Sequence, residues 1–94
     1  MHVTVRNYTG TPGLADELVK NEGEVRDLIT GIDGFQAYYL IKTSDGEAVS
    51  ISVYDDQAGT DESTRLAREW VQTNLPDLAV SPPQVLAGEV VIQA

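Results

Sequence analysis

The order of two hydrophobic periods along the chain constrains its fold more than any other feature of the sequence. A period of two, typical of β-strands, occurs at residues 2–8, 35–42, 48–54 and 85–93. A period of 3.6, typical of amphipathic helices, occurs at residues 14–29 and 58–75. The resulting order βαββαβ predicts a ferredoxin-like α+β fold, in which a four-stranded antiparallel sheet carries two helices on one face. We expect residues 1–94 to form a single domain.

The charge balance and the residue usage exclude several classes of function. Fifteen acidic residues against six basic ones give a net charge of −9, which argues against nucleic acid and anionic membranes as partners. There is no cysteine and one histidine, His2, and no glycine-rich phosphate loop follows the first strand. We therefore expect no haem, no flavin and no tightly bound metal. The absence of a signal segment or a long apolar run favours a cytoplasmic location.

Local signals place the ends of the two helices. Thr11 is a candidate N-cap for the first helix and Pro12 suits its first turn, while Gly23 weakens its middle. Asp55 and Asp56 precede the second helix, where carboxylates stabilise free N–H groups, so capping is the expected role of this acidic pair rather than metal binding.

The alternation of side chains divides the sheet into two faces of different chemistry. In the third strand Val49, Ile51 and Val53 share one face, and two serines and a tyrosine share the other. The aliphatic face is predicted to meet the helices, which would place Asn7 there too. The mixed face is enriched in tyrosine and depleted in lysine, as subunit interfaces are. It is therefore predicted to form a homodimer interface, consisting of Arg6, Tyr8, Tyr38, Leu40, Tyr54, Glu89 and Val91, with Arg6 and Glu89 paired across neighbouring strands.

Three segments carry a resemblance to a known family. They are residues 34–39 (GFQAYY), residues 49–56 (VSISVYDD) after a glycine-centred hairpin, and the pair Glu69-Trp70 on the second helix. Together they resemble the antibiotic biosynthesis monooxygenase-like domains of the dimeric α/β-barrel superfamily, over essentially the whole chain. The resemblance implies a homodimer with its two sheets packed face to face, and a pocket in each subunit between the sheet and the helices.

The resemblance also implies two chemistries. Some members oxidise aromatic polyketides or quinols with molecular oxygen and no cofactor, and steady the substrate anion with a polar or cationic group. Others degrade haem with an asparagine, a tryptophan and an iron-ligating histidine. Asn7 and Trp70 match the first two of these by position, whereas His2 lies at the wrong end of its strand. Haem degradation is therefore disfavoured, and no residue is assigned to the cationic role.

These considerations give a candidate site and two functional hypotheses. Asn7 and Trp70 are the candidate catalytic residues, although an asparagine at a strand end also caps loops and a tryptophan at helical spacing also packs a core. The predicted ligand pocket contains Asn7, Phe35, Tyr39, Leu66 and Trp70. The chain is predicted to be a homodimeric protein that binds a small aromatic ligand, as a cofactor-independent monooxygenase. The alternative is a non-catalytic dimeric module that binds a ligand or partner.

Overall fold

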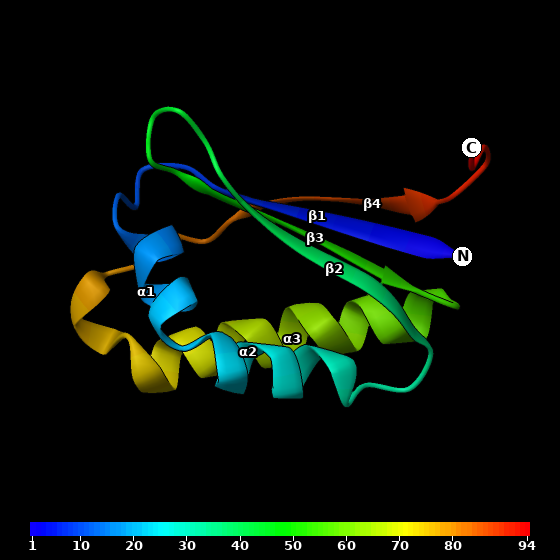
Figure 1. The fold of residues 1–94 in the computed structure, drawn as a ribbon, viewed down its shortest axis with the longest axis horizontal. Helices are drawn as coiled ribbons and strands as arrows, with labels where there is room; N and C mark the ends of the chain where they lie inside the picture. Colours follow the sequence, from blue (N-terminus) through cyan, green and yellow to red (C-terminus); the bar gives the residue numbers. More distant parts are fainter.

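A computed structural model, which describes all residues 1–94, has one four-stranded sheet with its helices on one side (Figure 1). The strands are β1 (His2–Tyr8), β2 (Phe35–Lys42), β3 (Ala48–Tyr54) and β4 (Gln84–Glu89). The helices are α1 (Leu14–Lys20), α2 (Glu22–Thr30) and α3 (Gln57–Asn74), followed by the 3-10 turn η1 (Pro76–Leu78). No helix is both long enough and apolar enough to cross a membrane.

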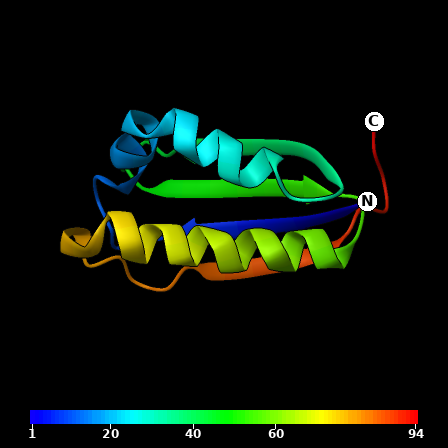
Figure 2. The ribbon, with the colours of Figure 1, turned by 90° about the horizontal axis from the view of Figure 1, so that it is seen from below.

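The strand order confirms the predicted ferredoxin-like topology. The strands lie in the order β2-β3-β1-β4, and each neighbouring pair is antiparallel. Figure 2 shows α3 running beneath β1 and β4, with α2 beside it beneath the other half of the sheet. The helices therefore lie in one layer and leave the opposite face of the sheet open.

The first helical region is two helices rather than one. The break lies at Asn21, whose backbone N–H bonds to the carbonyls of Glu17 and Leu18 and whose side chain bonds to the Glu17 carbonyl as well. Thr11 was predicted to cap α1, but it does not, because the helix begins after Gly13, which has a φ of 91°. The Thr11 hydroxyl instead accepts a hydrogen bond from the backbone of Ser81.

Helix α3 begins where the sequence predicts and packs closely on β3. Asp56 is its N-cap and accepts a hydrogen bond from the backbone N–H of Gly59. A Cβ at Gly59 would lie 2.7 Å from the Cβ of Tyr54, so only glycine allows the helix to approach the strand this closely. Pro76 ends the helical segment and starts η1.

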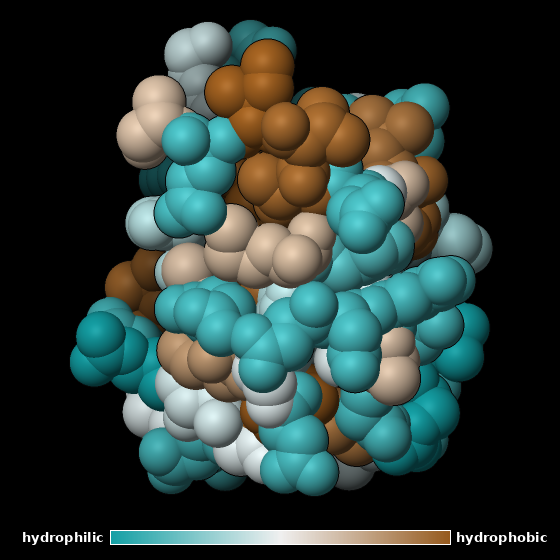
Figure 3. All heavy atoms as spheres, turned by 90° about the vertical axis from the view of Figure 1, so that its right-hand side faces the viewer, coloured by the Kyte–Doolittle hydropathy of each residue, from teal (hydrophilic) through white to brown (hydrophobic).

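The prediction of which sheet face meets the helices is wrong. The buried residues of β1 and β3 are the polar set, consisting of Thr4, Arg6, Tyr8, Ala48, Ser50, Ser52 and Tyr54. The aliphatic residues between them lie on the open face, where Tyr39 is 60% and Leu86 is 63% exposed. Figure 3 shows hydrophobic residues gathered on the sheet side of the molecule, whereas the helix side is largely hydrophilic.

The inversion has a physical reason in α3 itself. The inner side of this helix carries small and hydroxyl residues, Gly59, Thr60 and Ser63, all of them buried. Such a surface can satisfy buried hydroxyl and guanidinium groups, whereas an aliphatic sheet face would leave those polar groups unpaired. The polar sheet face therefore pairs with the polar stripe of the helix.

Two further expectations about the sheet need correction. Arg6 lies opposite Val85, and Glu89 lies opposite His2, so Arg6 and Glu89 do not pair. A register shift between Phe35 and Ala37 places Phe35 on the helix side and Tyr39 on the open side. The sequence pattern placed these two residues on one face because a bulge is invisible to a strict alternation of side chains.

Candidate functional site

Arg6 is the most unusual side chain in the structure because its charge is buried without a carboxylate. It is 1% exposed, and its guanidinium lies between β3 and α3. Nε donates to Ser50 Oγ at 3.0 Å, and Nη2 donates to Ser52 Oγ at 3.0 Å. Nη1 donates to Ser63 Oγ at 3.2 Å and to Thr64 Oγ1 at 3.0 Å. These contacts occupy four of the ~5 N–H groups of a guanidinium, and every acceptor is a neutral hydroxyl.

The cations of the chain divide into paired and unpaired groups. The four that form ion pairs with carboxylates are Lys20, Arg26, Lys42 and Arg65. Arg6 and Arg68 form no ion pair, although the chain has fifteen acidic residues. Burial of a charge costs free energy unless the charge is paired. An anion that binds beside an unpaired buried guanidinium would therefore be stabilised by its positive charge.

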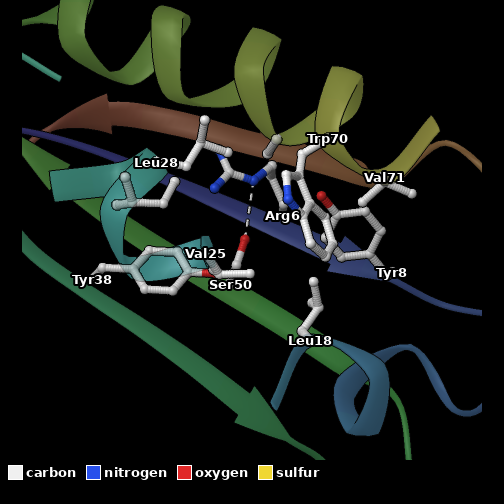
Figure 4. Close-up of a pocket in the computed structure, with 11 residues that line it drawn as sticks. Arg6, Tyr8, Leu18, Val25, Leu28, Tyr38, Ser50, Trp70 and Val71 are labelled. Carbon is white, nitrogen blue, oxygen red and sulfur yellow. Dashed lines mark hydrogen bonds between the residues drawn. The ribbon is translucent and has the colours of Figure 1, made fainter. Parts of the chain in front are cut away.

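An inner chamber surrounds Arg6 on the side of α1 and α2. Figure 4 shows Arg6 reaching from β1 toward Ser50, with Trp70 and Tyr8 beside it and Tyr38 on β2 across from them. The rest of the wall is aliphatic and includes residues of all three helices: Leu18, Val25, Leu28, Ile29, Ala67 and Val71. The free volume is about 30 Å³, so this chamber has room for little more than a water molecule.

An outer chamber lies on the other side of Arg6, between α3 and the segment that leads into β4. Its free volume is about 240 Å³, and it shares Arg6, Tyr8 and Val71 with the inner chamber. Its remaining lining residues come from α3, from the segment between η1 and β4, and from β4 itself: Thr64, Arg68, Gln72, Val80, Ser81, Pro82, Pro83 and Val85. The outer chamber therefore has room for a small organic molecule, and none of its lining residues is acidic.

The tyrosines near Arg6 keep their protons. Burial raises the pKa of Tyr8 and of Tyr38 above the usual value, and the Arg6 charge opposes that rise only in part. Burial likewise raises the pKa of Tyr54 to about 12, and its hydroxyl donates to the Ile29 carbonyl at 2.7 Å. At neutral pH the phenols are therefore hydrogen-bond donors or acids, and not bases.

The residues predicted for the pocket are dispersed. Trp70 lines the inner chamber, but Asn7 lies on the open sheet face with Tyr39, away from both chambers. Phe35 packs edge-on against Tyr54, with ring centroids 5.9 Å apart, in a cluster that also contacts Leu66. Phe35 and Leu66 therefore belong to the core, and neither lines a chamber with Trp70.

The predicted interface residues are dispersed in the same way. Arg6, Tyr8 and Tyr54 lie beneath the helices of their own subunit and cannot contact another sheet. Tyr38 and Leu40 also pack on the helix side. Of the predicted set, Glu89 and Val91 are exposed.

The residues that sequence reasoning missed are the hydroxyl partners of Arg6. Ser50 and Ser52 alternate on β3, and Ser63 and Thr64 are adjacent on α3. A polar stripe on the helix that matches a polar face of the sheet is a signal in the sequence, and it would have placed Arg6 in the interior. No group of three or more His, Asp or Glu side chains is placed to hold a metal ion.

Comparison with known proteins places the fold. No protein-family model and no curated protein matches the sequence. Several solved structures match it, among them a protein from Nitrosomonas europaea assigned as an antibiotic biosynthesis monooxygenase. That protein has a TM-score of 0.74 and 11% identity, over 98% of this chain and 100% of the other.

Two further matches are an oxygenase and a porphyrin-bound protein. SnoaB, a cofactor-independent oxygenase from Streptomyces nogalater, matches with a TM-score of 0.64 and 16% identity, over 98% of this chain and 93% of that one. A variant of MhuD with two manganese protoporphyrin IX molecules per active site matches with a TM-score of 0.74 and 14% identity, over 100% and 98% of the two chains. The chain therefore has the ferredoxin-like fold of the antibiotic biosynthesis monooxygenase-like proteins.

Proposed function

We propose that the chain is a homodimeric small-molecule-binding protein whose ligand is an electron-rich aromatic or quinol-type compound, bound as an anion. Its activity would be cofactor-independent oxygenation of that ligand. The observation that supports this proposal best is the buried, unpaired guanidinium of Arg6 beside the aromatic side chains of Trp70, Tyr8 and Tyr38. The cationic role that the sequence left unassigned would fall to Arg6, and Asn7 is withdrawn as a candidate catalytic residue.

The reaction would use the ligand as its own reductant. Loss of a proton from the ring methylene of an anthrone-type substrate gives an enolate, whose oxygen Arg6 would stabilise. The carbanion carbon transfers electrons to oxygen and forms a C–O bond, giving a peroxide anion. A proton converts it to a hydroperoxide, and loss of water leaves a carbonyl. The balance is CH₂ plus O₂ to C=O plus H₂O, with no further reductant.

The tyrosines would serve as donors in this scheme. Their raised pKa values keep Tyr8 and Tyr38 protonated, so either hydroxyl can donate to the enolate oxygen or supply the proton to the peroxide. Neither can remove the first proton at neutral pH. The substrate would therefore enter in its ionised form, which the positive charge of Arg6 favours.

Homodimerisation would use the open face of the sheet. Its aliphatic centre is formed by Val3, Val5, Val49, Ile51 and Val53, with Tyr39, Ile41 and Leu86 around it. Exposed large apolar patches of this kind mark interaction sites. We therefore move the proposed interface from the polar face to this aliphatic one, and we propose a second copy of the chain as its occupant.

The decisive experiment measures ligand binding and oxygen consumption together. An anthrone or quinol should change the fluorescence of Trp70, the only tryptophan, and should be oxidised with uptake of oxygen. Arg6→Met should abolish oxygen uptake, whereas Asn7→Ala should leave it unchanged because Asn7 lies on the open face. Unchanged Trp70 emission across a panel of such compounds, together with no oxygen uptake, would refute the proposal.

The non-catalytic module remains the second candidate, and one observation favours it. The inner chamber holds only about 30 Å³ because Trp70 and the aliphatic side chains nearly fill it. A purely structural role would predict that Trp70→Phe lowers stability and that no ligand raises the melting temperature. Oxygen uptake by the wild-type chain, lost in Arg6→Met, would exclude this alternative.

A further inference from the structure

We infer that the outer chamber is a carboxylate-binding site, with Arg68 as the residue that attracts and holds the charged group at its entrance. This inference goes beyond the proposed function, because it assigns a ligand class to the outer chamber. The outer chamber shares Arg6, Tyr8 and Val71 with the inner one. The ligand it assigns is a small molecule with a carboxylate on an apolar body of about one ring.

The first argument is the distribution of unpaired positive charge. Every lysine and arginine outside this cavity pairs with a carboxylate, and the two arginines that pair with none, Arg6 and Arg68, both line it. The chain has fifteen acidic residues, and none of them pairs with either arginine. The pairing pattern therefore leaves the charges of Arg6 and Arg68 without a counter-ion at this cavity.

The contrast with Arg65 makes the point sharper. Arg65 lies three residues before Arg68 on α3 and pairs with both Glu62 and Glu69. Arg68 has no acidic partner and lines the chamber with Thr64 and Gln72 of the same helix. Two arginines of one helix thus differ in environment, one neutralised on the surface and one unpaired at a cavity.

The second argument is the chemistry of the chamber wall. The polar lining residues can all donate a hydrogen bond through a guanidinium, hydroxyl or amide group, and they are Arg6, Tyr8, Thr64, Arg68, Gln72 and Ser81. The Thr64 oxygen accepts from Arg6, which leaves its own O–H free to donate into the chamber. A donor-rich wall without a carboxylate suits an oxyanion, and paired N–H groups of a guanidinium match a carboxylate particularly well.

The third argument is size and apolar surface. The chamber volume of about 240 Å³ lies just below the ~300–1,000 Å³ range of typical ligand pockets. The apolar part of its wall consists of Val71, Val80, Pro82, Pro83 and Val85. These side chains suit the flat body of one ring, whereas a large fused ring system would not fit without opening the inner chamber.

The test uses benzoate and its neutral isostere benzamide as probes of the whole chain. Amide signals of Thr64, Gln72 and Ser81 should shift on titration with benzoate, and calorimetry should give a saturable affinity. Benzamide should bind at least ~10-fold more weakly, because the charge-assisted hydrogen bonds are lost. Equal affinity for the two probes would overturn the inference.

The matched variants are Arg68→Gln and Arg65→Gln, which remove the same charge from the same helix. Arg68→Gln should weaken benzoate binding at least ~10-fold, and Arg68→Lys should restore part of it. Arg65→Gln should leave the affinity within ~2-fold, since surface charges are screened by salt. Equal losses in the two glutamine variants, or tighter binding of inorganic phosphate than of benzoate, would contradict a carboxylate site.

The outcome is separable from that of the proposed oxygenation. Benzoate has no oxidisable methylene, so its binding reports on the site alone. Benzoate binding without oxygen uptake from any anthrone would retain this inference and refute the oxygenase. Oxygen uptake that Arg68→Gln leaves unchanged, with no benzoate binding, would do the reverse.

Discussion

The two faces of the sheet differ in both polarity and burial. On β1 and β3, the face beneath the helices is mostly polar and buried, and it carries Arg6 among hydroxyl groups. The open face is aliphatic and partly exposed, with Ile51 at its centre between Val5 and Tyr39. Within one subunit the arrangement contradicts the usual expectation that apolar side chains lie inside. The contrast supports our proposal that the polar face holds a ligand site and that the aliphatic face packs against a second copy of the chain.

The largest effect should come from a charge at the centre of the open face. Ile51→Asp should weaken the proposed dimer by at least ~100-fold, because an unpaired carboxylate would be buried at the interface. Sedimentation equilibrium checks the mass. Thr73→Asp, at an exposed position of α3, is the control and should remain dimeric. A wild-type chain that sediments as a monomer would refute the proposal that the open face is a dimer interface.

The next effect tests how closely the covered face is packed. Gly59→Ala places a methyl group 2.7 Å from the Cβ of Tyr54, so helix and strand must separate. We expect a loss of about 1–3 kcal/mol in the free energy of unfolding, measured by urea denaturation. Gly23→Ala in α2 meets no atom within 4 Å and should instead gain about 0.5–1 kcal/mol. A gain in both variants would show that the covered face tolerates expansion.

A smaller effect comes from the buried phenol of Tyr54. Tyr54→Phe removes the hydrogen bond to the Ile29 carbonyl and should cost about 1 kcal/mol at neutral pH. With the pKa of Tyr54 raised to about 12, the folded chain keeps a proton that the unfolded chain loses near pH ~10. Stability should therefore fall as the pH rises from there toward about 12. Denaturation across that range should show a shallower fall for Tyr54→Phe, and identical slopes would contradict the assignment.

The smallest effect concerns the one buried polar side-chain atom that has no hydrogen-bond partner, the Thr4 hydroxyl oxygen. Thr4 is 1% exposed, and its hydroxyl forms no hydrogen bond. Thr4→Val keeps the shape and removes that unpaired hydroxyl, so the melting temperature should rise, by an amount equivalent to less than about 1 kcal/mol. Ser52→Ala is the counterpart, because it removes a partner of Arg6 and should lower the melting temperature. A fall in both would mean that Thr4 has a hydrogen-bond partner.

The order of the elements could be predicted from the sequence because each depends on local signals, although the first helix divides at Asn21 and the last strand ends at Glu89. The strands β1 and β3 alternate cleanly, and the Asp56 cap and Pro76 mark both ends of α3. The orientation of the sheet could not be predicted from hydropathy, because a ranking of faces by apolarity assumes that a single subunit buries the more apolar one. That assumption fails here because the buried Arg6 is bonded to hydroxyl groups of both the sheet and α3.

The predicted positions of the candidate site residues depended on that orientation. Trp70 lines the inner chamber, and its helical spacing is independent of which sheet face lies above it. Asn7 and Arg6 are adjacent in sequence, so reversing the sheet exchanged their positions. The bulge after Phe35 places Tyr39 on the open face and Phe35 on the helix side. The alternation of side chains in the sequence does not reveal such a backbone irregularity.

The placement of Arg6 also has a consequence for the kinetics of ligand entry. A chain of net charge −9 repels an anion at long range, whereas Arg6 and Arg68 attract it only within the cavity. Added salt screens the distant repulsion over a Debye length of ~8 Å at physiological ionic strength, and it acts less on buried charges. Moderate salt should therefore accelerate the association of an anionic ligand, the opposite of electrostatic steering. The ligand would then cross a repulsive barrier set by the surface charge of the protein and be retained by the two unpaired arginines, Arg6 and Arg68.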